Sequence, residues 1–209
     1  MIAVLYFHGF ASSPASAKIT ALRPLLGDAI ELITPDLNVP SFEQLDYDAM
    51  IALALDAARR TPPRAIVGSS LGAIVALEVA SRGVDAPLVL IAPALGVADR
   101  WKERLPAGDP IVVFNHARAR NVPIHRRFFE QIAQVRVDAD PPRCRVTVLM
   151  GRKDETVPFD CVERVWKSWS DSGRLPAGSR FLELEEGDHS LVNHTSLIAD
   201  AIREAAASD

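Results

Sequence analysis

Short apolar runs alternate with longer amphipathic stretches along most of the chain. The apolar runs are bounded by glycine, proline or polar residues, and such runs are typical of buried β-strands. They lie at residues 2–7, 29–34, 65–67, 87–92, 145–150 and 180–184. The stretches between them carry apolar residues at helical spacing, which predicts helices. Strands that alternate with helices favour a parallel sheet covered on both faces. We therefore expect a three-layer α/β fold around a mainly parallel sheet of about six strands.

Turn-forming residues predict where the first two helices begin. Ser13-Pro14 is typical of an N-cap followed by proline at the first helical position. Pro24 predicts a break in that helix, because proline removes a backbone donor and crowds the preceding turn. Ser41 and Gln44 have the spacing of a capping box, which predicts that the second helix starts there.

The segment from about residue 95 to residue 137 interrupts the alternation. It mixes the apolar run 111–114 with helix-like pieces and is too long for a simple connection. Long excursions between strands are commonly lids or binding elements. We expect one domain over residues 1–209, with a lid or cap-like insertion at about 95–137.

Composition and charge exclude several classes of partner. The chain has 209 residues, 48% of them hydrophobic and 24% charged, with a net charge of −4, as in ordinary soluble domains. This charge gives no case for binding nucleic acid or an acidic membrane, and no apolar run is long enough to span a bilayer. Cys144 and Cys161 fit no metal or redox spacing. We expect a cytoplasmic protein, a monomer or homodimer.

A glycine-rich pentapeptide joins the third predicted strand to the helix that follows it. Gly68-Ser69-Ser70-Leu71-Gly72 matches G-x-S-x-G, the nucleophile elbow, which exposes its central serine on a sharp turn. The residues two before and two after that serine nearly touch, so both must lack bulk. The glycine spacing selects Ser70 rather than Ser69 as the nucleophile. The alternative is a plain glycine-rich turn between a strand and a helix.

An acid and a histidine follow in the order that a serine nucleophile requires. A serine hydroxyl needs a base, and the base needs an acid to orient it. Asp154 follows the fifth predicted strand and His189 follows the sixth. Carboxyl ends of parallel strands share one rim, which predicts that both meet Ser70. Asp154 as a turn residue or helix cap, and Glu155 as the acid, remain alternatives.

Two backbone N–H groups are candidates for an oxyanion hole. The elbow places the N–H of Leu71, and the loop His8-Gly9-Phe10 after the first strand offers that of Phe10. His8 is expected to brace this loop. His189 and His194 lack a third ligand, so we expect no metal there.

The motifs together resemble the α/β-hydrolase superfamily, and in particular the small YqiA-type esterases. The matching segments are His8-Gly9-Phe10, Ser12-Ser13-Pro14-x-Ser16-x-Lys18, Gly68-Ser69-Ser70-Leu71-Gly72, Asp154 and Gly187-Asp188-His189. The resemblance implies a trimmed sheet that starts at the strand before the oxyanion loop. It also implies hydrolysis of carboxylic esters or thioesters without a cofactor. The segment 95–137 resembles these relatives least.

These patterns favour a serine hydrolase acting on small acyl esters or thioesters. The same three residues also serve acyl transfer or amide and peptide cleavage, and an idle triad would leave a binding protein. The segment 95–137 carries eight cationic and four anionic side chains. The arginines, Arg126 among them, suggest an anionic substrate, and the alternative is a solvated helical face whose arginines only balance local acids. The apolar residues proposed to line an acyl pocket there are Phe114, Ile124, Phe128 and Phe129.

Overall fold

Six parallel strands form the central sheet of the computed structural model, which describes residues 1–105 and 107–207. Their order across the sheet is β2-β1-β3-β4-β7-β8, and every neighbouring pair is parallel. The strands are β1 (Ile2–Phe7), β2 (Ile30–Ile33), β3 (Ala65–Ser69), β4 (Leu88–Ile91), β7 (Val146–Gly151) and β8 (Arg180–Leu184). The predicted parallel sheet is therefore confirmed.

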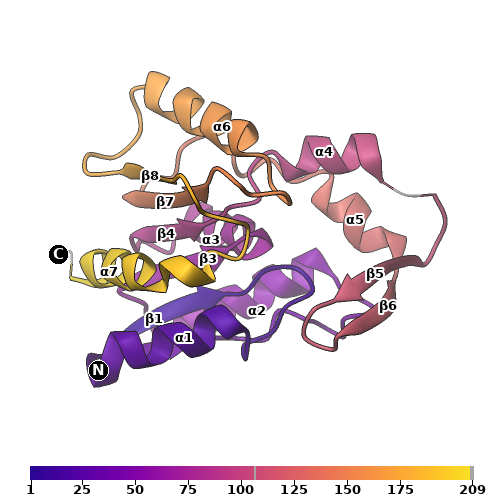
Figure 1. The fold of residues 1–209 in the computed structure, drawn as a ribbon, viewed down its shortest axis with the longest axis horizontal. Helices are drawn as coiled ribbons and strands as arrows, with labels where there is room; N and C mark the ends of the chain where they lie inside the picture. Colours follow the sequence, from indigo (N-terminus) through magenta and orange to yellow (C-terminus); the bar gives the residue numbers. More distant parts are fainter. Residues whose placement is uncertain (106, 208–209) are drawn as a thin grey trace.

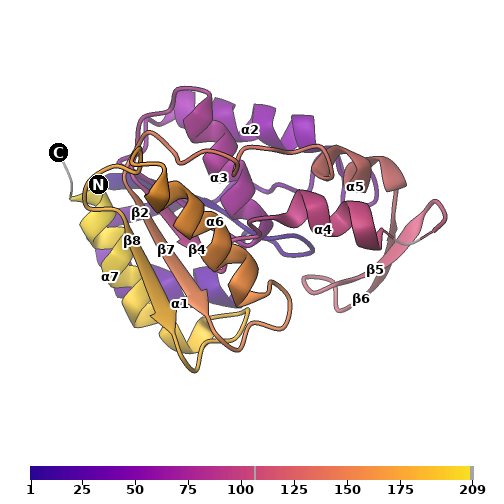
Figure 2. The ribbon, with the colours of Figure 1, turned by 90° about the horizontal axis from the view of Figure 1, so that it is seen from above.

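Helices cover both faces of this sheet and make the three layers. On one face α1 and α7 pack together, and α2, α3 and α6 lie on the other (Figures 1 and 2). They are α1 (Ala17–Leu26), α2 (Tyr47–Arg60), α3 (Leu71–Ser81), α6 (Phe159–Asp171) and α7 (Thr195–Ala206), with 3₁₀ turns η1 (Gly27–Ala29) and η2 (Val192–His194).

The core is deepest around β3 and the helix that follows it. Strands β3, β4 and β7 are buried along their whole length. Helix α3 is apolar on nearly every side, because the sheet covers one side and α2 another. The turn between β3 and α3 is therefore held in the middle of the molecule.

The first two helices begin later than the turn signals predict. Helix α1 is capped by Ser16, whose Oγ accepts from the N–H of Ile19 at 3.5 Å, and not by Ser13. Helix α2 is capped by Asp46, whose carboxylate accepts from the N–H of Ala49 at 3.0 Å. Ser41 instead closes a local turn by accepting from a backbone N–H three residues later.

Helix α1 also continues through Pro24 instead of breaking near Arg23. Leu22 and Leu26, on either side of this proline, are both buried against the body. Their packing holds the last turn in helical form, because burial of two leucines outweighs the one backbone hydrogen bond that proline cannot donate.

The segment 95–137 is a helix–hairpin–helix insertion between β4 and β7. It consists of α4 (Val97–Arg104), β5 (Ile111–Asn115), β6 (Arg120–Ile124) and α5 (Arg126–Ile132). Strands β5 and β6 form an antiparallel hairpin that stands away from the main sheet (Figures 1 and 2). The hairpin end is tied to the loop after β1, since the N–H of His116 donates to the carbonyl of Ala11 at 3.0 Å.

An aromatic cluster joins this insertion to the body. Phe10 stacks on Phe128 with ring centroids 5.7 Å apart, and Trp101 lies 5.1 Å from Phe129. Such pairs stabilise a contact beyond the area that they bury. The cluster thus packs α4 and α5 against the loop that follows β1.

Candidate active site

Ser70 stands at the tip of a strained turn between β3 and α3. Its backbone has φ 53° and ψ −117°, a region that non-glycine residues rarely occupy. The N–H of Ser70 donates to Ile91 at 2.9 Å, and its carbonyl accepts from Ala94 at 3.1 Å. Both partners lie at or just after the end of the neighbouring strand β4, which holds the strained residue in place.

Gly68 and Gly72 are required by the close approach of the chain around Ser70. A Cβ at Gly68 would overlap the backbone of Gly72 and Ala73, and a Cβ at Gly72 would overlap the carbonyl of Phe7. The spacing seen in the sequence therefore has a steric cause. It also brings the end of β1 against the elbow.

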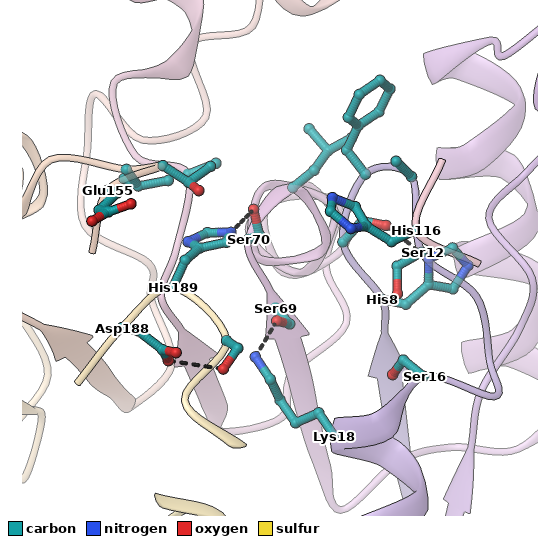
Figure 3. Close-up of a pocket in the computed structure, with 18 of the residues that line it drawn as sticks. His8, Ser12, Ser16, Lys18, Ser69, Ser70, His116, Glu155, Asp188 and His189 are labelled. Carbon is teal, nitrogen blue, oxygen red and sulfur yellow. Dashed lines mark hydrogen bonds between the residues drawn. The ribbon is translucent and has the colours of Figure 1, made fainter. Parts of the chain in front are cut away.

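His189 connects Ser70 to a buried carboxylate. Its Nε2 lies 3.2 Å from Ser70 Oγ (Figure 3), and its Nδ1 lies 2.8 Å from Asp154 Oδ2. Both are hydrogen-bond distances, and with Nδ1 protonated the ring donates to Asp154 and accepts from Ser70. The three residues from three separate loops are brought together.

The second carboxylate oxygen of Asp154 accepts two backbone hydrogen bonds that fix the side chain. Its side chain is fully buried, and Oδ1 accepts from the N–H groups of Thr156 at 2.9 Å and Val157 at 2.7 Å. These two bonds are typical of a turn. Asp154 therefore both forms the turn and supplies the carboxylate that contacts His189. Glu155 borders the cavity, but the carboxylate bonded to His189 is that of Asp154.

The loop after β1 lies directly against the elbow. Gly9 approaches Ser70 so closely that an added Cβ would be 3.2 Å from the Cβ of Ser70. His8 is buried and braces the loop, accepting from the N–H of Leu37 at 3.0 Å and contacting the carbonyl of Gly9 at 2.9 Å.

Two backbone N–H groups beside Ser70 are available to bind a ligand. No hydrogen bond found among the described residues uses the N–H of Phe10 or of Leu71. Leu71 is also the first residue of α3, where the helix dipole favours negative charge. This arrangement suits an oxygen that becomes negative during reaction at Ser70.

A cavity of about 970 Å³ opens beside Ser70 and His189 (Figure 3). Its size is that of small-molecule sites. The apolar part of its wall includes Phe10, Leu71, Val97, Trp101 and Phe114. The insertion therefore contributes side chains to the cavity.

Only one of the aromatic residues proposed for an acyl pocket borders this cavity. Phe114 does so from the hairpin and is half exposed. Phe128, Phe129 and Ile124 are buried and do not border the cavity, because the inner face of the insertion packs them into the core beside Phe10. Trp101 takes the place expected for them, and the sequence analysis missed it.

The arginines proposed to overhang the site also lie elsewhere. Arg118 pairs with Glu43 at 2.5 Å, and Arg126 pairs with Glu130 at 3.2 Å. Neither borders the cavity. Of the arginines in the insertion, Arg100 borders it, and its guanidinium donates to the carbonyl of Thr156 at 2.8 Å. Arg126 therefore does not line the cavity beside Ser70.

Lys18 is a buried cation beneath the elbow that the sequence analysis did not assign. Its Nζ donates to Ser69 Oγ at 2.9 Å (Figure 3). Burial lowers the pKa of Lys18 to about 8, and the charges of Asp188 and Asp154 partly oppose this shift. The available signal was helical spacing, because Lys18 shares the inward stripe of Leu22 and Leu26.

The described part of the chain contains neither a cluster of metal ligands nor a helix that could span a membrane. Residues 1–105 and 107–207 hold no group of three or more His, Cys, Asp or Glu side chains placed to bind a metal ion. None of the helices described is both long enough and apolar enough to cross a bilayer.

Comparison with known proteins gives one family match and several solved structures of similar fold. The model of the uncharacterised protein family UPF0227 matches residues 3–201. No curated protein matches the sequence. Est1E from Butyrivibrio proteoclasticus, solved with ferulic acid, is similar at a TM-score of 0.77 and 17% identity, over 98% of this chain and 87% of that one.

Two further solved structures share the fold at low identity. Mouse alpha/beta hydrolase domain-containing protein 10 has a TM-score of 0.74 and 19% identity, over 97% of this chain and 88% of its own. The esterase domain of a Rhodothermus marinus protein has a TM-score of 0.71 and 16% identity, over 96% of this chain and 84% of its own. The fold is therefore that of the α/β hydrolases.

Proposed function

This chain belongs to the uncharacterised protein family UPF0227, and from that premise we propose that it is a serine hydrolase of small carboxylic esters or thioesters. The observation that carries the proposal is the hydrogen-bonded series Ser70, His189 and Asp154 at a strained elbow. The named esterases among its structural neighbours agree with it.

In this proposal Ser70 Oγ attacks the carbonyl carbon of the substrate while His189 Nε2 takes its proton. Asp154 holds the ring in the tautomer that accepts at Nε2 and stabilises the cation that forms. The N–H groups of Phe10 and Leu71 donate to the oxygen as it becomes negative. His189 then gives its proton to the departing alcohol or thiol, leaving an acyl group on Ser70.

The acyl group is released by the reverse use of the same residues. Water enters the cavity, His189 removes its proton, and the resulting hydroxide adds to the acyl carbon. The tetrahedral intermediate collapses, the acid leaves, and Ser70 recovers its proton from His189. Every step uses protein groups and water, so we propose that no cofactor takes part.

Acyl transfer and amide or peptide cleavage would use the same residues and differ in the acceptor or the bond. A binding protein with an idle triad would have no need of a strained nucleophile within 3.2 Å of a histidine. Both cysteines are free thiols, which supports the proposed cytoplasmic location.

Hydrolysis of 4-nitrophenyl esters of graded chain length tests the proposal. The wild-type protein should show a burst of one nitrophenol per chain when release of the acyl group is slow. Ser70→Ala should lower kcat by at least about a thousandfold while the fold is kept. Ser81→Ala, on the far end of the same helix, is the matched control. A folded Ser70→Ala variant with near-normal turnover would refute the proposal.

A further inference from the structure

Lys18 carries a buried positive charge that is not paired with a carboxylate. The residue is 8% exposed, and the acceptor found for its ammonium is the neutral hydroxyl of Ser69. An ammonium has three hydrogens to donate. None of the ion pairs found among the described residues includes Lys18. A charge buried in this way is costly unless something pairs with it.

The two carboxylates whose charges act on Lys18 hold other hydrogen bonds, which in Asp188 are both accepted by Oδ1. Asp154 accepts from His189 on one oxygen and from two backbone N–H groups on the other. Asp188 accepts from Ser190 Oγ and from the N–H of Leu191, both at 2.8 Å. They act on Lys18 through space without binding it, and with a pKa of about 8 the ammonium is mostly charged at neutral pH.

The same cavity that borders Ser70 also borders Lys18. Figure 3 shows the ammonium at Ser69, and the polar part of the cavity wall also includes Ser16, Ser190 and the carboxylate of Asp188. Ser69 and Ser70 are consecutive, and consecutive Cα atoms are about 3.8 Å apart. Because Lys18, Ser69 and Ser70 line one cavity, a ligand in it can contact Lys18 while its carbonyl carbon lies at Ser70.

We propose that Lys18 and Ser69 form an anion subsite that binds a carboxylate of the substrate. The preferred substrate is then a short ester or thioester that carries a second, negatively charged carboxylate group. This inference rests on the proposed function of Ser70 and names the substrate class. Arg100 also lines this cavity without an ion pair among the described residues, but it is only partly buried and already donates to a carbonyl, so Lys18 is the stronger candidate.

Two substrates that differ only at their far end test the subsite. Mono(4-nitrophenyl) adipate ends in a carboxylate, and 4-nitrophenyl hexanoate has the same six carbon atoms and ends in a methyl group. The wild-type protein should prefer the adipate in kcat/KM. Lys18→Met, which keeps the length of the side chain and removes its charge, should lower that preference about tenfold or more, chiefly through KM.

Two matched variants distinguish binding at Lys18 from a general electrostatic attraction between the protein and an anionic substrate. Arg120→Gln also removes one positive charge, from the exposed hairpin, and should keep the preference. Arg100→Gln should keep it as well. A preference lost in Arg100→Gln and kept in Lys18→Met would overturn the assignment. Equal kcat/KM for the two esters in the wild-type protein would overturn the whole inference.

Binding of adipate to the Ser70→Ala variant gives a readout that needs no catalysis. Calorimetry should detect adipate binding that is weakened about tenfold or more by adding Lys18→Met. If the protein hydrolyses neither ester but binds adipate through Lys18, the proposed reaction fails and the subsite stands. If it hydrolyses hexanoate and Ser70→Ala binds no adipate, the subsite fails and the proposed reaction stands.

Discussion

Adjacent carboxylates in the loop after β7 have very different surroundings. Asp154 is fully buried and bonded to His189, whereas Glu155 is exposed at the cavity. Asp154→Asn should lower kcat by about a thousandfold to ten-thousandfold, because the amide favours the wrong tautomer of the ring. Glu155→Gln should change kcat by less than about tenfold. Steady-state kinetics on a neutral ester checks this, and the opposite ranking would assign the acid to Glu155.

The free energy of unfolding should depend on pH because of Lys18. The pKa of Lys18 in the folded protein is about 8, below its ordinary value of 10.5. Between these two pH values the unfolded chain holds a proton that the folded one has released, so stability rises with pH in this window. Below about pH 8 the burial cost is fully present, on the order of 3 kcal/mol.

Lys18→Met should therefore be more stable than the wild type at pH 7, less the contribution of one lost hydrogen bond. The difference should shrink as the pH rises from 8 towards 10. Urea denaturation of both proteins across this range measures it. A variant that is less stable by the same amount at every pH would show that the ammonium supports the fold.

Sequence motifs predicted the three residues that the structure brings together, whereas residue spacing alone did not reveal Lys18. Ser70, Asp154 and His189 each follow a strand, and parallel strands bring their ends to one rim. Lys18 shares the inward stripe of its helix, but a lysine within a helix is ordinarily solvated, and its contact with Ser69 shows that it is buried beneath the elbow. That contact joins residues 51 positions apart, which no local pattern contains.

At the element scale, the elbow and the end of β1 form one packed unit. A methyl group at Gly72 would overlap the carbonyls of Phe7 and His8 and push the oxyanion loop away from Ser70. Gly72→Ala should cost about 3 kcal/mol or more of stability and most of the activity. Gly173→Ala adds its methyl group in open space at φ 66°, and should cost about 1–2 kcal/mol with activity kept. Equal activity in the two variants would contradict this.

The strands were predictable and the starts of the first two helices were not, for a physical reason. A buried strand needs a run of apolar residues and shows it locally, as in Ile2–Phe7, where prediction and structure agree. Several side chains near a helix start can cap it, and tertiary packing chooses among them. Asp46 caps α2 instead of Ser41, partly because the side-chain amide of Gln131 in α5 donates to the second carboxylate oxygen of Asp46 at 3.1 Å.

At the scale of the whole molecule, the insertion is attached to the body by its aromatic cluster. Phe129 is 5% exposed and packs on Phe10 and Trp101. Phe129→Ala should destabilise the protein by about 3–5 kcal/mol. Phe114→Ala, which removes a half-exposed ring at the cavity, should change stability by less than about 0.5 kcal/mol and raise KM for apolar esters. Denaturation midpoints and KM values check both, and an undisturbed Phe129→Ala variant would mean a loosely held insertion.

The most direct measurement of the central claim is reaction with a fluorophosphonate followed by mass spectrometry of the digested protein. This reagent modifies a serine that its neighbours have activated. We predict one adduct per chain, located on Ser70, abolished by Ser70→Ala and strongly reduced by His189→Ala. An adduct on another residue, or a folded protein that hydrolyses esters and takes up no reagent, would contradict the account.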